Sequence, residues 1–153
     1  MKHVRGIVCI GMVSACLVAS GCWKSASTEL ENGLKYSDSE DYQNAIASFT
    51  TVIRLESGHA EAHYYRDLAR YQTGLHEEAI ADYSKAILIK PNFPEAFLNR
   101  GLARHRLGGY KSAIDDMEKA IQLNPRDGTA YSSRDKIEAD GREHGIGPAP
   151  KRN

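Results

Sequence analysis

Two histidines are spaced so that they could act together on a metal ion. His59 and His63 are four residues apart, which puts two side chains on one face of a helix. No third ligand is close to them in sequence, and His59 is expected in the loop before the helix. His76 is followed by Glu77 and Glu78, but no second His completes the H-E-x-x-H pattern of zinc proteases. We therefore interpret these histidines as structural or surface residues, and we predict no metal site.

Patterns that would supply a catalytic nucleophile or hold a phosphate are also missing from the sequence. It contains no G-x-S-x-G turn, no glycine-rich phosphate-binding loop and no Cys/His pair. The sequence thus predicts neither an enzyme nor a small-molecule cofactor. The alternative, an enzyme or an accessory subunit with its own small-molecule site, would require a pocket of convergent polar groups.

The remaining reactive group is the thiol of Cys22, at the end of an apolar N-terminal segment. Lys2 and Arg5 precede an uncharged run that ends in Ala19-Ser20-Gly21-Cys22. A charged start, a short apolar run and small residues at its end are typical of a secretory signal. The run has about 14 residues, whereas a helix needs roughly 20 to cross a bilayer. We expect residues 1–21 to be a signal peptide that is removed.

The four residues that end this segment resemble the lipobox of bacterial lipoproteins. In that family the Cys becomes the first residue of the processed chain and carries a diacylglycerol; Ala19 stands where Leu or Val is more common. The resemblance implies a covalent lipid on Cys22, whose acyl chains would anchor the protein to a membrane. Trp23 follows where Asp usually marks retention in the inner membrane, so the outer membrane is favoured. The alternative is an ordinary cut near Gly21 and a secreted protein without lipid.

The charge and cysteine counts exclude several classes of protein. The chain has 153 residues, with 20 basic and 20 acidic side chains and three Cys. Balanced charge gives no basic stripe for a nucleic-acid backbone, and three Cys are too few for a disulfide framework or a four-cysteine zinc module. Removing residues 1–21 takes away Lys2 and Arg5 but no acid, which leaves a slightly acidic protein. We predict no nucleic-acid partner.

The rest of the chain repeats itself with a period of 34 residues. Identical residues recur 34 positions apart along the segment from Glu61 to Pro125, and a weaker copy precedes it. Within each copy apolar residues recur at helical spacing, and breakers such as Gly74 and Pro91 separate the helices. Each copy is therefore predicted to be a pair of helices.

These copies resemble the tetratricopeptide repeat. The resemblance rests on small residues, large residues and terminating prolines at corresponding places: Gly33 and Gly101; Ala45, Ala79 and Ala113; Phe49, Tyr83 and Met117; Ala86 and Ala120; Pro91 and Pro125. The sequence departs from the family pattern where Asp67 replaces Gly, Val52 a small residue, Ser57-Gly58 a Pro, and Arg70 and Arg104 Tyr. The first copy is accordingly the most degenerate.

The resemblance implies an all-α solenoid of three helix pairs, at 26–59, 60–93 and 94–127. Residues 128–141 would form a capping helix, with Asp127 or Thr129 as its N-cap, because a solenoid must cover its last apolar face. Residues 22–25 would be the lipidated Cys and a short spacer. The tail at 142–153 has nothing to bury and is expected to be disordered.

Members of this family bind partners through the concave surface that their first helices line. Carried across, that surface would contain Leu30, Leu34, Ser37, Tyr64, Leu68, Tyr71, Gln72, Leu98, Leu102, His105 and Arg106, of which we predict partner contacts for Leu30, Tyr64, Leu68, Tyr71, Leu98, Leu102, His105 and Arg106. A surface of Leu and Tyr suits an amphipathic helix or extended peptide, with Tyr64 and Tyr71 as hot spots. The Lys and Asn with which eukaryotic chaperone adaptors clamp a C-terminal carboxylate are absent from the corresponding places. Leu34, Leu68 and Leu102 recur in every copy, so a core role is equally open for them.

Recurring charges have a structural interpretation. Arg66, Arg100 and Arg134 are 34 residues apart, and so are Asp82 and Asp116. We predict that they form ion pairs within each helix pair rather than a ligand site.

The combined prediction is a membrane-anchored scaffold or assembly factor of the bacterial cell envelope, facing the periplasm and holding a protein partner. The spacer after Cys22 reaches at most ~20 Å when extended, so the partner would be close to the membrane. A cytoplasmic cochaperone is the third possibility and would require an uncleaved N-terminus. The sequence does not choose among pilus, barrel-assembly and cell-wall processes.

Overall fold

The computed structural model describes residues 25–145 of the chain. The predicted signal peptide, Cys22 and residues 146–153 of the tail lie outside this range. The described residues form seven helices: α1 (Ala26–Asp38), α2 (Tyr42–Leu55), α3 (Ala60–Gln72), α4 (His76–Ile89), α5 (Pro94–Arg106), α6 (Tyr110–Leu123) and α7 (Gly128–Glu143). They contain no strand, and the predicted all-α solenoid of helix pairs is confirmed.

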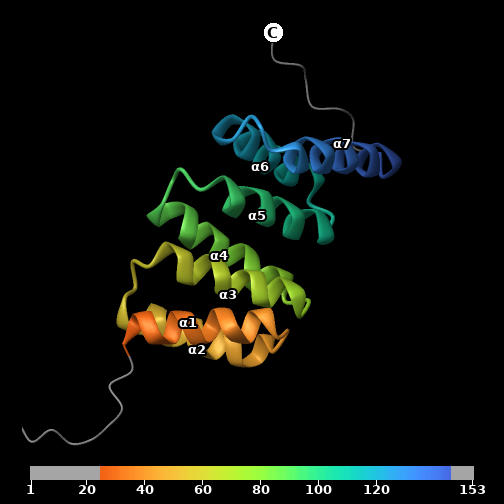
Figure 1. The fold of residues 1–153 in the computed structure, drawn as a ribbon. Coiled ribbons are helices and arrows are strands. Elements are labelled where there is room, and N and C mark those ends of the chain that lie inside the picture. The colour runs from red at the N-terminus through yellow and green to blue at the C-terminus, as the bar shows by residue number, and fades with distance from the viewer. Residues whose placement is uncertain (1–24, 146–153) are drawn as a thin grey trace, which may run out of the picture.

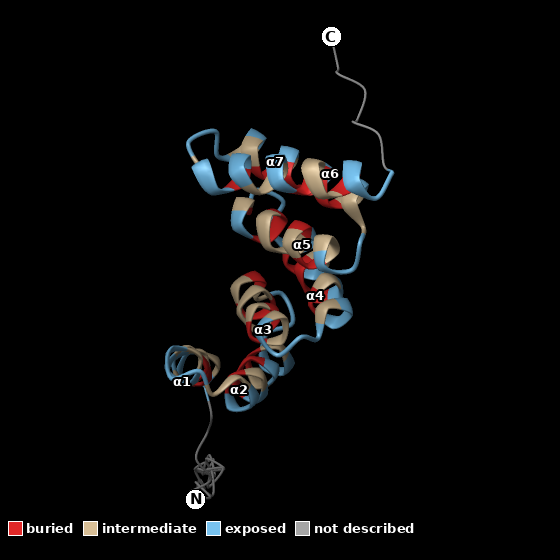
Figure 2. Ribbon diagram, turned by 90° about the vertical axis from the view of Figure 1, so that its right-hand side faces the viewer, coloured by how far each residue is buried: buried red, intermediate tan, exposed pale blue. Residues whose placement is uncertain are grey.

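The helices stack in chain order, each against the next (Figure 1). The side view shows the odd-numbered helices on one side of the stack and the even-numbered ones on the other, with α1 and α7 projecting beyond α3 and α5 (Figure 2). Contacts also join α1 to α3, α3 to α5 and α5 to α7. The odd-numbered helices therefore form one continuous, concave side.

The turns inside the three helix pairs follow one design. Glu40, Gly74 and Gly108 are 34 residues apart and all have positive φ, at 59°, 80° and 75°. In each turn the N–H of the following residue donates to the carbonyl five residues earlier, as from Leu75 to Arg70 at 2.9 Å. This bond ends the helix at a residue in the left-handed conformation, which favours glycine. The first repeat makes the same turn with Glu40, which has a side chain to accommodate there.

The small and large residues that recur every 34 positions meet in the core of each pair. Ala79 and Tyr83 are fully buried, and a Cβ added to Gly33 would lie 2.5 Å from the ring of Phe49. A Cβ on Gly101 would likewise lie 2.7 Å from the methyl of Met117. Small residues on one helix thus admit the large side chain of its partner, as ordinary close packing requires.

Helix α7 covers the end of the stack, as predicted, but it is longer than expected. Ala130 and Ile137 are buried, and Ile137 packs in one cluster with Met117 of α6. The helix ends at Glu143 rather than at residue 141, so the first residues of the expected disordered tail are helical. The reason is contact with α6, because the ring of Tyr110 stacks on His144 with 5.2 Å between centroids. Asp127 is the N-cap, and its carboxylate accepts from the N–H of Thr129 at 2.9 Å.

Between residues 25 and 145, no helix has the length and apolar content needed to cross a membrane.

Candidate functional site

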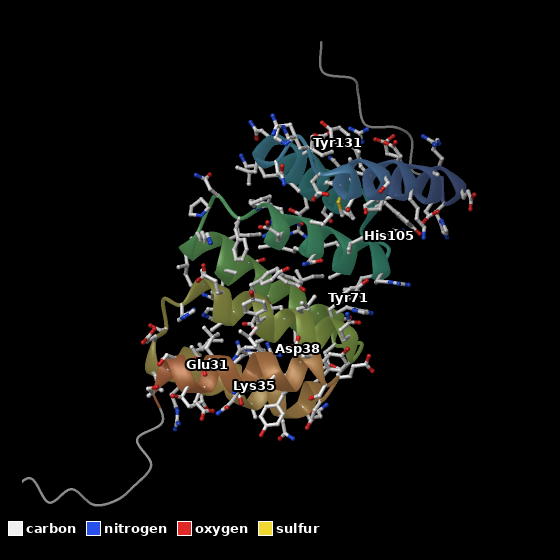
Figure 3. All side chains as sticks on the ribbon, viewed as in Figure 1. Glu31, Lys35, Asp38, Tyr71, His105 and Tyr131 are labelled. Carbon is white, nitrogen blue, oxygen red and sulfur yellow. The ribbon has the colours of Figure 1, made fainter. Side chains whose placement is uncertain are left out.

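The concave face is the surface on which the predicted partner contacts lie. It comprises side chains of α1, α3 and α5: Leu30, Leu34, Tyr64, Leu68, Tyr71, Leu98, Leu102, His105 and Arg106. All of them are half-buried except Arg106, which is exposed. Figure 3 shows Tyr71 and His105 at corresponding ends of neighbouring helices, with Glu31, Lys35 and Asp38 of α1 on the same side of the molecule.

The leucines of the concave face also support the core. Leu30 and Leu34 pack against Ala45 and Phe49, and Leu98 and Leu102 pack against a cluster that contains Met117 and Ile137. Each leucine nevertheless keeps part of its surface accessible. Of the two alternatives that the sequence left open for Leu34 and Leu102, the core role is therefore confirmed, and partner contact stays a prediction.

Tyr64 is held within the contact between the second and third repeats. Its ring lies 4.9 Å from that of Phe93 and 5.3 Å from that of Tyr65, centroid to centroid. Its hydroxyl accepts a hydrogen bond from Nδ2 of Asn99 at 2.9 Å. Burial, together with nearby Glu95, raises the pKa of the Tyr64 phenol. Replacing Tyr64 would therefore disturb the packing of α3 on α5 as well as any bound partner.

Polar side chains connect successive odd-numbered helices across the concave face. Asn99 bonds to Tyr64, Arg106 to Tyr71 and His105 to Asp140, with separations of 2.9, 3.2 and 2.8 Å respectively. Each pair is 35 residues apart in sequence, one more than the repeat. Sequence reasoning missed Asn99 and Asp140, although a search for polar pairs at this spacing could have found them.

A small pocket opens between α3, α5 and α7. It has a volume of about 100 Å³ and is lined by Tyr71, Leu102, His105, Arg106, Ser133, Lys136 and Ile137. Four of the predicted contact residues meet here, whereas Leu30, Tyr64, Leu68 and Leu98 do not line it. Ser133 and Lys136 were not predicted, because α7 was expected only to cover the end of the stack. A larger, open depression of about 390 Å³ lies around residues 108–115.

Buried ion pairs stabilise the second and third helix pairs, as the recurring charges predicted. The carboxylate of Asp116 forms ion pairs with Nη2 of Arg100 at 2.6 Å and with Nη1 of Arg104 at 2.7 Å. Asp82 is held in the same way by Arg66 and Arg70, so the arginines that replace the usual Tyr complete each cluster. For the third recurring arginine the prediction was wrong.

Arg134 has no acidic partner on a following helix within the described chain, since α7 is the last helix there. It instead pairs with Asp135 at 2.8 Å and with Glu138 at 3.8 Å, both on its own helix.

Asp67, which replaces the usual Gly, is the most unusual ionisable group. Its side chain is fully buried, and neither of its oxygens nor the hydroxyl of Tyr83 has a hydrogen-bond partner among the described residues. Burial, and then the neighbouring carboxylate of Asp82, raise the pKa of Asp67 to about 11. The Asp67 carboxyl is therefore a neutral acid at pH 7.

His59 and His63 have structural roles. The ring of His59 caps α3 by accepting from the N–H of Ala62 at 3.2 Å, and buried His63 contacts the carbonyl of Ser57 at 3.3 Å. No cluster of three or more His, Cys, Asp or Glu side chains in residues 25–145 could hold a metal ion.

Two sequence models match the chain, one described as TPR repeat over residues 68–108 and one as tetratricopeptide repeat over residues 94–127. A comparison with curated proteins gave no significant match.

Solved structures share this fold. The second TPR domain of human RPAP3, in complex with an HSP70 peptide, is 30% identical with a TM-score of 0.71, over 73% of this chain and 93% of that one. The Arabidopsis OM64 TPR domain is 27% identical with a TM-score of 0.73, over 74% and 94%. The TPR2B domain of yeast Sti1, in complex with pHsp70, is 25% identical with a TM-score of 0.69, over 78% and 97%.

Proposed function

Because the chain belongs to the tetratricopeptide repeat family, we propose that it is a protein-interaction scaffold whose concave face binds a peptide or an amphipathic helix of a partner protein. The observation that carries this proposal is the row of half-buried Leu and Tyr side chains that α1, α3 and α5 present on one side. Two similar domains, from human RPAP3 and yeast Sti1, are in complex with an HSP70 peptide and with pHsp70, which supports peptide binding as the mode.

The chemistry of the concave face suits this role. Tyr71 and Leu68 lie on a helix and are partly exposed, so each offers apolar area to a partner. Because these side chains are already partly held in place, they lose little conformational entropy when a partner covers them. The polar pairs that cross from helix to helix keep the helices in one arrangement. A groove that is organised before binding stabilises the complex by reducing the cost of ordering.

Partner capture with two matched leucine variants tests the proposal. Leu68→Glu places a charge on the concave face, whereas Leu88→Glu makes the same change at a residue of α4 that is 73% exposed. We expect Leu68→Glu to weaken partner capture from crosslinked envelopes at least about tenfold, since covering a charge at a partner contact costs about 1.4 kcal/mol or more. Partners would be quantified by mass spectrometry.

The control, Leu88→Glu, should capture the same partners as the wild type. Circular dichroism at 222 nm should show equal helix content in both variants. Equal capture by Leu68→Glu and Leu88→Glu, with both folded, would contradict binding at the concave face.

We further propose that the scaffold is anchored by lipid on Cys22 to the bacterial envelope, facing the periplasm, with the outer membrane favoured. The support is in the sequence alone: the charged start, the short apolar run and the Ala19-Ser20-Gly21-Cys22 ending. Helix α1 begins at Ala26, so only a few residues separate Cys22 from the folded stack. A partner held on this stack would be close to the membrane.

Metabolic labelling with a fatty-acid probe checks the anchor. Wild-type protein should incorporate the probe, and Cys22→Ser should lose it almost completely, because the thiol is the attachment atom. Cys16→Ser, a matched change within the predicted signal, should still be labelled. Label on Cys22→Ser would refute attachment at this residue.

A further inference from the structure

We propose that the pocket between α3, α5 and α7 binds a carboxylate of the partner peptide, so that the scaffold prefers acidic segments. The inference rests on the proposed peptide-binding function and adds the chemical class of the partner. It is carried by the polar side chains that three helices bring together in one small cavity: Tyr71, His105, Arg106, Ser133 and Lys136.

The two cations of the pocket are available to a ligand. Arg106 uses its Nε to donate to the hydroxyl of Tyr71 at 3.2 Å, which fixes the guanidinium but leaves its two terminal nitrogens as donors. Neither Arg106 nor Lys136 forms an ion pair with an acid elsewhere in residues 25–145, unlike Arg100 and Arg104 of the same stack. A planar guanidinium with two free donors matches a carboxylate, which accepts two parallel hydrogen bonds.

The charge of the pocket fits one carboxylate. Arg106 and Lys136 contribute two positive charges, and Asp140 lies against His105 with 2.8 Å between Oδ2 and Nε2. Without counting His105, the two cations and the one carboxylate carry a net charge of +1. One carboxylate balances this charge, whereas a phosphate group at −1.5 to −2 exceeds it.

The size of the pocket indicates a single functional group rather than a whole small molecule. Its volume of about 100 Å³ holds several waters, since one water needs roughly 10–15 Å³. Sites for drug-sized ligands begin at about 300 Å³. An acidic side chain of a peptide that otherwise lies along the concave face fits this space.

The pocket is built into the structure by α7. Ile137 is 1% exposed and packs with Met117, so the side of α7 that bears Ser133 and Lys136 is fixed against α5 and α6. The hydrogen bond from His105 to Asp140 ties α5 to α7 at the same place. The last helix therefore supplies ligand groups in addition to covering the core.

The test uses full-length protein and three pools of fluorescein-labelled decapeptides. The pools have amidated C-termini and random neutral residues, and differ at one fixed position, which is Glu, Gln or phosphoserine. Fluorescence anisotropy should show the Glu pool binding at least about tenfold tighter than the Gln pool. In the double variant R106Q/K136Q this ratio should fall below about twofold, while affinity for the Gln pool is unchanged.

A charge-matched control is R54Q/K111Q, which removes two exposed cations of α2 and α6 and should keep the tenfold ratio. Equal affinity of the wild type for Glu and Gln pools would overturn the carboxylate site but leave peptide binding intact. Tighter binding of the phosphoserine pool than the Glu pool would overturn the choice of carboxylate. An equal loss in R54Q/K111Q would overturn a local site, and no binding of any pool would contradict the proposed function itself.

Discussion

Asp116→Ala is expected to lower the free energy of unfolding by about 3 kcal/mol, because it leaves two arginines without their counterion in a mostly buried site. Asp116 is 3% exposed and receives Arg100 and Arg104 at 2.6 and 2.7 Å. Arg100 also donates to Ser84 at 3.0 Å, so the cluster connects the third repeat to the second. Urea unfolding followed at 222 nm, and a fall in the melting temperature of about 10 °C, would show the effect.

The matched comparison for this prediction is Arg134→Ala. Arg134 occupies the corresponding place in α7, but its partners Asp135 and Glu138 lie on the same helix and are accessible to water. Pairs of this kind contribute at most about 1 kcal/mol. If Asp116→Ala cost no more than Arg134→Ala, the buried cluster would not be a source of stability.

Asp67→Asn is expected to stabilise the protein at neutral and alkaline pH and to leave it unchanged in acid. The pKa of Asp67 is raised from 3.8 to about 11 in the folded protein, so folding takes up a proton between these values. A raised pKa favours the folded state below pH 3.8, and this contribution is lost as the pH rises toward 11. The loss is about 1.4 kcal/mol per pH unit, or about 4 kcal/mol between pH 5 and pH 8. Asn has the shape of the neutral acid and does not titrate.

Urea denaturation from pH 5 to pH 8 measures this difference. The free energy of unfolding of Asp67→Asn, relative to the wild type, should increase by about 1.4 kcal/mol per pH unit over this range. Asp115→Asn, the same change at an exposed residue of α6, should show no such growth. A difference between wild type and Asp67→Asn that did not vary with pH would show that the carboxyl is ionised in the folded protein.

The fold could be predicted from the sequence because its determinants are local and periodic. The 34-residue spacing of Ala45, Ala79 and Ala113 marks the position where one helix must approach another closely, and all three are fully buried. The turns were marked in the same way by Gly74 and Gly108. Such signals need no knowledge of distant contacts.

The candidate site was predictable only in part, because its geometry depends on neighbouring repeats. Tyr71, His105 and Arg106 could be assigned to the concave face from their position in the repeat. Lys136 could not, since α7 belongs to no helix pair and its rotation follows from burying Ile137. The neutral state of Asp67 was also beyond sequence reasoning, since it depends on complete burial beside Asp82.

Most contacts between helices join each helix to the next in sequence, and smaller contacts join successive odd-numbered helices. Mechanically, such an array is a set of elastic elements in series. For a protein held at its N-terminus and loaded at α5 and α7, tension passes through every interface between them and divides the extension among all of them. The stack would then act as a compliant linkage between membrane and partner, and each added repeat would lower its stiffness.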